Sequence, residues 1–339
     1  MKIKKNYILK LLSYFLLSFI LLILLTNASE ENEINSTNIT NNFFKFLHPI
    51  PIINKTLSKK NVKFFIISKL KLGTCFLGKT GSIIQRMIFC YLNKNKNKKN
   101  QIDFTLCKMD GKNYDTLENF EKIYGIKKFN QILKEFNFVR FVRNPIDRLI
   151  SGYMHLCYYG VNNKNHYCFE CDKNLTCFVT VLEKRLWQIL NNEITLYNKD
   201  NEITYSYHFY PQTWYVFYLI LKKIYKLFRH CEYYKLHNMF TYIKYNSSDK
   251  DSFSNSIAKL LKNFNISNNT LNFIYKKIYN VKTNHETLSK NETTTYKNIL
   301  YNNSLLLQKV CSIYYYDFIK FDFEFPKECI NSTNFLEIN

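Results

Sequence analysis

Arginine and acidic residues are both scarce in this 339-residue chain. Only six of its 48 basic residues are arginine, and its 26 acidic residues leave a net charge of +22 at pH 7. This balance favours polyanionic partners such as nucleic acid, anionic lipid or acidic glycan. The sequence also contains no H-E-x-x-H motif, and no carboxylate cluster in it suggests a metal site. It therefore indicates no metal cofactor.

The N-terminal 60 residues differ in composition from the rest of the chain. Four lysines precede an apolar run from Leu11 to Leu25, whose length approaches the ~20 residues that span a bilayer. A cleaved signal peptide is the alternative, since the small residues Ala28 and Ser29 follow the run. The lysines favour a cytoplasmic N-terminus and a lumenal C-terminal domain. We therefore predict a cytoplasmic tail at residues 1–6, a signal-anchor transmembrane helix at 7–26, a stem at 27–60 and a lumenal domain at 61–339.

Cysteine usage agrees with a lumenal domain. Of ten cysteines, Cys157, Cys168, Cys171 and Cys177 lie close together, which in an oxidising lumen indicates disulfides of undetermined pairing. A zinc site at Cys168 and Cys171 is the weaker alternative, because the flanking spacings fit no usual zinc module. Sequons of the form N-x-[ST] also support this compartment, although only weakly in so asparagine-rich a chain. The eleven sequons begin at Asn27, Asn35, Asn38, Asn54, Asn174, Asn246, Asn265, Asn268, Asn291, Asn302 and Asn331.

The stretch GTCFLGKT, from Gly73 to Thr80, matches the P-loop pattern G-x-x-x-x-G-K-[ST]. Read in this way, it predicts a nucleotide hydrolase or kinase. However, the residues Thr74–Leu77 are more typical of the end of a buried strand than of a phosphate-binding turn. The loop is then Gly78–Ser82, with a helix beginning near Ile83. In both interpretations a strand that ends at Gly, Lys and hydroxyl residues before a helix predicts an anion site.

Three of the six arginines, Arg140, Arg143 and Arg148, fall within nine residues. The composition prefers lysine elsewhere, so these positions are expected to need the planar fork that binds phosphate or carboxylate in two places. The plain alternative is that Arg143 pairs with a neighbouring carboxylate beside a helix cap.

The arginines sit in a predicted strand followed by a helix. Phe138–Val142 is mostly aromatic and β-branched, and Asn144 and Pro145 are typical of a helix N-cap and first turn. Arg143 would then end the strand, and Ser151 would lie about two turns into the helix. In an open parallel α/β sheet, ligands bind at this edge.

Together the two segments resemble the carbohydrate sulfotransferases of the Golgi that use 3′-phosphoadenosine-5′-phosphosulfate (PAPS). In that family a K-[ST]-G-[ST] loop holds the 5′-phosphosulfate, and a strand followed by R-x-P-x-x-R-x-x-S-x-Y holds the 3′-phosphate. Lys79–Ser82 and Arg143–Tyr153 match these patterns. The resemblance implies cofactor contacts from Lys79, Thr80, Gly81, Ser82, Arg143 and Ser151.

The resemblance extends over residues 65–326 and is nearest to the nematode branch of the family. The segment His208–Trp214 is similar to the family's H-x-x-P-Q, and Thr283–Thr287 resembles a T-x-H-x-T loop near the cofactor, which implies that His285 contacts the cofactor. Tyr314–Phe321 is similar to a closing Y-x-x-D-[FY]-x-x-F. One departure is Ile83, where that branch often has a second hydroxyl residue.

The family fold implied is a three-layer α/β domain with a parallel sheet, similar to P-loop proteins, behind the membrane anchor. The sequence places strands near residues 64–77, 138–142 and 241–245, and helices around 117–135, 175–191 and 293–313.

The implied activity is sulfuryl transfer from PAPS to a carbohydrate hydroxyl in the Golgi lumen, where nucleic acid is not an expected partner. A chondroitin-like acceptor would suit the basic charge. We expect Lys79 to stabilise the leaving phosphate and His208 to act as the general base, with His285 as second candidate.

Two alternatives remain. A P-loop kinase would need an acidic Mg²⁺ ligand at the end of an apolar strand, and none is evident. A non-catalytic glycan-binding descendant of the family would look the same unless a contact residue were lost.

Overall fold

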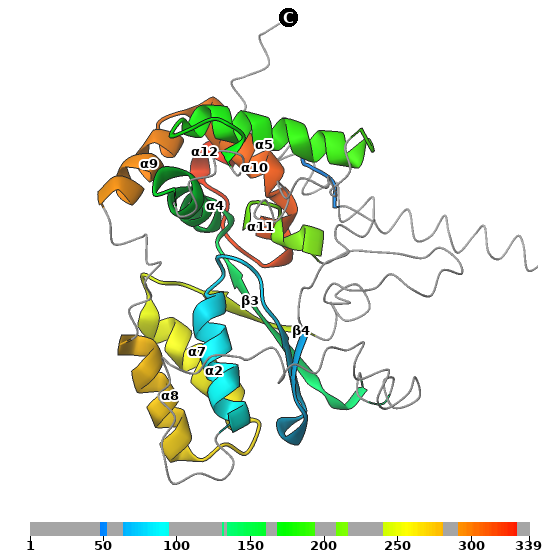
Figure 1. The fold of residues 1–339 in the computed structure, drawn as a ribbon, viewed down its shortest axis with the longest axis vertical. Helices are drawn as coiled ribbons and strands as arrows, with labels where there is room; N and C mark the ends of the chain where they lie inside the picture. The colour runs from blue at the N-terminus through cyan, green and yellow to red at the C-terminus, as the bar shows by residue number, and fades with distance from the viewer. Residues whose placement is uncertain are drawn as a thin grey trace, which may run out of the picture. The chain divides into compact units, whose positions relative to one another are not determined.

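A four-stranded sheet forms the centre of the part of the chain that the computed structural model describes. Its strands are β1 (Phe64–Ile67), β2 (Leu72–Cys75), β3 (Asn137–Arg143) and β4 (Phe240–Tyr245), in that order across the sheet. β1 is antiparallel to β2, whereas β3 is parallel to both β2 and β4. The sheet is therefore mostly parallel, and the carboxyl ends of β2, β3 and β4 lie at one edge (Figure 1).

The structure describes residues 48–52, 64–94, 131, 134–160, 168–193, 208–215, 240–280 and 291–330. Residues His48–Cys329 fold as one unit. The predicted tail and anchor helix, and most of the predicted stem, lie outside the described residues. Within the described ranges, no helix combines the length and the apolar character that a membrane span requires.

The prediction of one strand near residues 64–77 is wrong in one respect, because this segment forms two strands. It is a hairpin of β1 and β2, turned by a short 3₁₀ helix at Ser68–Leu70 and by Lys71, which has a left-handed φ of 46°. The predicted strands at 138–142 and 241–245 are confirmed as β3 and β4. The turn was missed because its residues include Leu70, and so the apolar pattern continues almost without a break.

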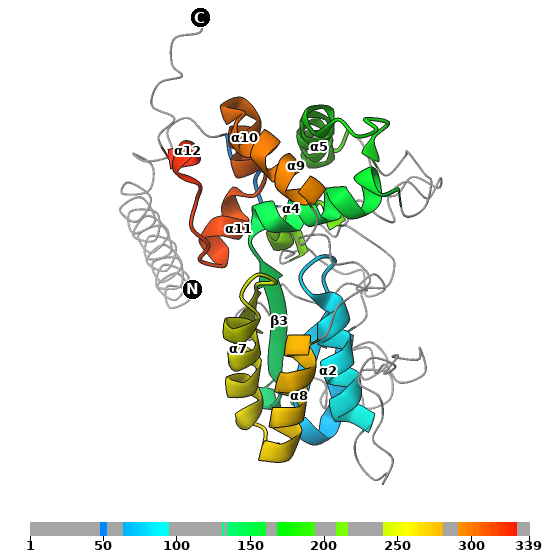
Figure 2. The ribbon, with the colours of Figure 1, turned by 90° about the vertical axis from the view of Figure 1, so that its left-hand side faces the viewer.

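Three helices cover one face of the sheet: α2 (Ser82–Lys94), α7 (Lys250–Lys262) and α8 (Asn268–Asn280). Their buried apolar side chains join those of the strands in one cluster, which includes Phe89, Phe253 and Ile274. Figure 2 shows these helices in front of β3. Two layers of the predicted α/β domain are thus described, while the helix predicted at 117–135 lies almost entirely outside the described residues.

A second group of helices lies beyond the carboxyl end of β3 (Figure 1). The helix predicted at 175–191 is confirmed as α5, but the one predicted at 293–313 is divided into α9 and α10. The division occurs where Asn303 caps α10 by accepting a hydrogen bond from the Leu306 N–H at 3.0 Å. The elements of this region are α4 (Pro145–Tyr153), the π-helical turn η3 (Met154–Tyr158), α5 (Leu175–Leu190), the 3₁₀ helix η7 (Gln212–Tyr215), α9 (Asn291–Tyr301), α10 (Ser304–Ile313), α11 (Tyr315–Lys320) and α12 (Lys327–Ile330).

Disulfides stabilise the connections of the helical group. Cys157 is bonded to Cys168, and Cys171 to Cys177. The prediction of disulfides is therefore confirmed, and the zinc alternative for this cluster is wrong because these thiols are bonded to each other. A third bridge joins Cys311 and Cys329, and every described cysteine is disulfide-bonded.

Candidate functional site at the carboxyl edge of the sheet

The loop between β2 and α2 has the form of an anion-binding turn. Lys79 and Gly81 have left-handed φ angles of 68° and 78°, and α2 begins at Ser82. Such alternation of backbone conformation directs successive N–H groups toward one point. The Thr80 side chain is buried, and its hydroxyl donates to the Leu77 carbonyl at 3.0 Å. This hydrogen bond stabilises the turn.

The P-loop interpretation of GTCFLGKT does not fit this geometry. Gly73 and Thr74 lie within β2 and pair with Phe138 and Val139 of β3. Gly73 is therefore a residue of the sheet and not the first residue of a phosphate-binding loop. The turn that remains is the shorter one at residues 78–82, as the strand pattern predicts.

Two arginines of the second motif bind the backbone of this loop. Arg143, the last residue of β3, donates from Nη1 to the Lys79 carbonyl at 3.1 Å. Arg148, on α4, donates from Nε to the Gly78 carbonyl at 3.1 Å and from Nη1 to the Tyr210 carbonyl at 2.7 Å. The two predicted motifs, separated by more than 60 residues, are thus joined at the same edge of the sheet.

The segment that begins at His208 contributes a third part of the site. The Gln212 side chain accepts from the Arg143 N–H at 3.0 Å and donates to the Arg143 carbonyl at 2.8 Å. The buried Asp317 carboxylate in turn accepts from the N–H of Gln212 at 2.6 Å and from the N–H and hydroxyl of Thr213, each at 2.7 Å. The Gln212 side chain, held in turn by Asp317, therefore fixes the backbone at Arg143.

Charge is distributed unevenly at this edge. The buried charged side chains of the described residues are Arg140, Arg143, Arg148 and Asp317. All four belong to the network around Gln212, because Arg140 donates from Nη2 to the Gln212 carbonyl at 3.2 Å. Among the described residues, three buried guanidinium groups therefore gather here with one buried carboxylate, and guanidinium groups are suited to bind an anion such as phosphate.

Burial also changes the proton affinity of two cations of the site. It lowers the pKa of Lys79 to about 7, with a further lowering by the positive charge of Arg143. Burial likewise lowers the pKa of the Arg143 guanidinium from its usual value. Lowered pKa values of this kind are typical of cations placed to bind an anionic ligand. A bound negative charge would raise both pKa values again.

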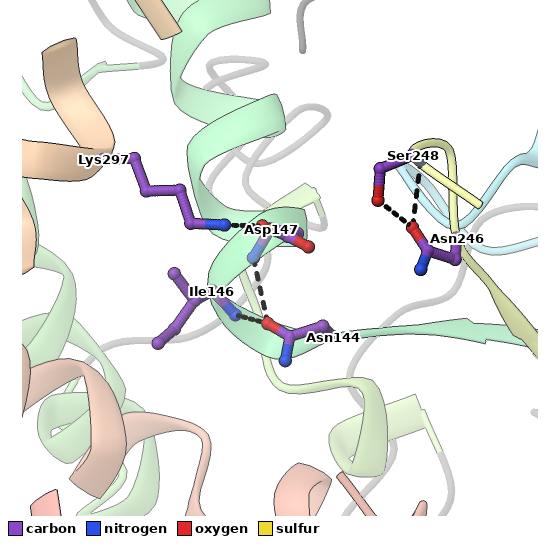
Figure 3. Close-up of polar contacts among 6 residues, drawn as sticks. All are labelled: Asn144, Ile146, Asp147, Asn246, Ser248 and Lys297. Atoms are coloured by element: carbon purple, nitrogen blue, oxygen red, sulfur yellow. Dashed lines mark hydrogen bonds and ion pairs between the residues drawn. The ribbon is translucent and has the colours of Figure 1, made fainter. Parts of the chain in front are cut away.

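The ends of β3 and β4 also carry ordered polar turns (Figure 3). Asn144 caps α4 by accepting from the N–H groups of Ile146 and Asp147 at 3.0 and 3.2 Å, which confirms the predicted N-cap. Asp147 forms an ion pair with Lys297 of α9 at 2.8 Å, so its role is to attach α9 to α4. After β4, the Asn246 side chain accepts from the N–H of Ser248 at 3.0 Å.

The remaining sequence-predicted residues fall in different surroundings. Ser151 is buried on α4, beside Gly152. His208 is half-buried, and its carbonyl would lie 3.6 Å from a Cβ atom added at Gly152, so the start of the segment packs against α4. His285 lies outside the described residues.

Sequence reasoning marked Arg148 only as one of three clustered arginines, and it did not assign Gln212 or Tyr245 to the site. Arg148 was marked by the arginine cluster, and Gln212 by the P-Q pair of its segment, but neither pattern revealed which backbone groups they bind. Tyr245, at the end of β4, had no sequence signal at all. Its register opposite Arg143 depends on the pairing of strands that are about 100 residues apart.

Comparison with known proteins agrees with this geometry. Residues 62–324 match the family model described as the Sulfotransferase family. Among curated proteins of Caenorhabditis elegans, "Putative sulfotransferase vep-2" is 22% identical over 71% of this chain and 75% of its own length. "Carbohydrate sulfotransferase chst-1" is 28% identical over 54% of this chain and 51% of its own length, and "Uncharacterized protein C18B2.2" is 23% identical over 78% and 70%. No solved structure matches.

The family match covers the loop, the arginine strand and helix, the Gln212 segment and the buried Asp317. This match confirms the resemblance drawn from the sequence. The similar proteins of Caenorhabditis elegans agree with the nematode branch. With these elements assembled at one edge of a mostly parallel sheet, the chain belongs to the sulfotransferase family.

Proposed function

We propose that the protein transfers the sulfuryl group of PAPS to a hydroxyl of a carbohydrate. The observation that carries the proposal is that the anion-binding turn at Gly78–Ser82 and the buried guanidinium group of Arg143 lie side by side at one edge of the sheet. A donor with phosphate at both ends suits two such neighbouring centres. The name of the relative chst-1 supports a sugar acceptor, and the net charge of +22 supports a polyanionic, chondroitin-like one.

Each residue of the site has a separate role in this transfer. PAPS supplies an activated sulfuryl group on a phosphate leaving group. Lys79 and the N–H groups of the loop stabilise the negative charge that the leaving phosphate gains. Arg143 binds the 3′-phosphate at the end of β3, and His208 accepts the proton of the acceptor hydroxyl. The network of Arg148, Gln212 and Asp317 keeps these groups in position.

Ligand choice and transfer together test this proposal. We expect calorimetric titration to show binding of PAPS and 3′,5′-ADP, with much weaker binding of ATP. Labelled sulfate should then pass from PAPS to a chondroitin acceptor. Preference for ATP with Mg²⁺ would instead favour a kinase, and binding of 3′,5′-ADP without transfer to any glycan would favour the non-catalytic descendant.

Binding of 3′,5′-ADP is expected to weaken as the pH rises above about 7. Without ligand, Lys79 loses its proton near this pH, whereas a bound phosphate raises its pKa and keeps it charged. Above pH 7 binding therefore takes up a proton, and the affinity falls by up to about tenfold per pH unit. Below pH 7 Lys79 is already protonated, and the affinity should change little from this cause.

The measurement is calorimetry at pH 8 in two buffers of different ionisation enthalpy. We expect an uptake approaching about one proton per ligand for the wild type and none for Lys79→Gln. Equal uptake in both proteins would show that another group takes the proton.

For location, we propose a Golgi membrane protein of type II with its catalytic domain in the lumen. The support is the apolar run from Leu11 to Leu25 after four lysines, together with disulfides typical of an oxidising compartment. In sealed microsomes, the domain should resist added protease until detergent is supplied. Digestion without detergent would contradict this topology.

A further inference from the structure

Tyr245 contacts both parts of the candidate cofactor site. It is the last residue of β4 and lies in register with Arg143, the last residue of β3. The Arg143 Cζ atom lies over the Tyr245 ring, 5.5 Å from its centroid. A guanidinium group over an aromatic face is attracted by the negative charge of that face, and more strongly where water is excluded.

The same ring also lies against the Gly78–Ser82 loop. A Cβ atom added at Gly81 would stand 2.6, 2.8 and 2.9 Å from three carbon atoms of the Tyr245 ring. These distances are below van der Waals contact, so the backbone of the loop rests on the ring. Only glycine fits Gly81 for this reason and also because of its φ of 78°.

The position of the ring is fixed from the core side. Phe253, a buried residue of α7, packs edge-on against Tyr245 with ring centroids 5.0 Å apart. Phe253 packs in the same manner against Phe141 of β3, at 5.3 Å. Tyr245 therefore packs on the core through Phe253, and its ring contacts both the loop and the Arg143 guanidinium group.

We propose that Tyr245 is a positioning residue that sets the spacing between the phosphosulfate loop and Arg143, and that it thereby determines the affinity for the cofactor. The inference rests on the proposed function. Its physical reason is that a ligand with phosphate at both ends needs its two binding centres at a fixed separation. The direct link between these centres, the hydrogen bond from Arg143 Nη1 to the Lys79 carbonyl, is a single contact. A rigid ring between the two keeps that link in place.

The test compares three variants by titration of the full-length protein with 3′,5′-ADP. Tyr245→Leu keeps an apolar side chain but removes the aromatic face, and we expect its affinity to fall about tenfold. Tyr245→Phe keeps the face and should stay close to the wild type. Tyr91→Leu is the matched control, since Tyr91 is a buried tyrosine of the same core cluster that stacks on Phe273 at 4.8 Å, away from the loop.

Thermal unfolding of each variant separates positioning from stability. We expect Tyr245→Leu and Tyr91→Leu to lower the melting temperature to a similar extent, while only Tyr245→Leu weakens the binding of 3′,5′-ADP. In transfer assays, Tyr245→Leu should raise KM for PAPS and leave KM for the acceptor unchanged.

The outcomes distinguish this inference from the proposed function. If the wild type binds 3′,5′-ADP and Tyr245→Leu binds it equally well, the positioning role of Tyr245 is wrong. A Tyr245→Phe variant as weak as Tyr245→Leu would also overturn it, because the hydroxyl and not the ring would then be responsible. If the wild type itself does not bind 3′,5′-ADP, the proposed function fails first.

Discussion

Replacing Arg143 by alanine is expected to weaken the binding of 3′,5′-ADP by about 2–5 kcal/mol, the range typical of a buried charge contact. Arg143 is buried at the end of β3, and its backbone is held on both sides by the Gln212 amide. Because the guanidinium is a planar fork, Arg143→Lys should also lose much of the affinity although it keeps the charge. Isothermal titration of the three proteins is the measurement.

Arg86→Ala is the matched control for this result. Arg86 is an exposed arginine of α2, the helix that follows the loop, so its loss removes the same charge without touching the site. We expect wild-type affinity for this variant. Should Arg143→Ala bind 3′,5′-ADP as tightly as Arg86→Ala does, Arg143 would have no part in the cofactor site.

The second large effect is expected at His208. Replacing a general base costs about 10²- to 10⁴-fold in rate and leaves remote binding contacts intact. His208→Ala should therefore keep the affinity for 3′,5′-ADP and lose turnover with a glycan acceptor. His208→Gln, which can form a hydrogen bond but cannot accept the proton, should be nearly as slow.

Contacts to the two residues that follow His208 hold the backbone there in place, so local collapse would not explain such a loss of turnover. Two residues further on, the Tyr210 carbonyl is held by Arg148 at 2.7 Å, and Phe209 is fixed through its carbonyl by the Tyr314 hydroxyl. The exposed His48 supplies a control, and His48→Ala should turn over at the wild-type rate. If His208→Ala retains most of its turnover, the base is another group, and His285 is the next to test.

Much of the site was predictable because its parts are local. Asn144 and Pro145 indicated a helix start, and the cap that forms uses N–H groups only two and three residues away. The loop at residues 78–82 was predicted from the strand that precedes it, and the cysteine cluster predicted disulfides. Each pattern depends on residues close enough in sequence to interact in almost any fold.

Two features that are also local were missed. The hairpin at Lys71 needed a left-handed residue that is not glycine, which the apolar pattern does not reveal. The division between α9 and α10 occurs at Asn303, whose side chain caps α10, and the predicted helix ran through this residue. In both cases the backbone conformation of one or two residues decided the outcome.

By itself, the sequence determined the loop, the arginine strand and helix, the disulfide-forming cysteines and the family. Each of these can be recognised from short segments of the chain. Only the tertiary structure decided which of them meet. Arg148 binds Gly78, Gln212 brackets Arg143, and Asp317 holds Gln212 across separations of 70, 69 and 105 residues. Tyr245 reaches both Gly81 and Arg143 because β4 pairs with β3 in one particular register. Strand order and register result from the burial of the whole core, so no short stretch of residues contains them.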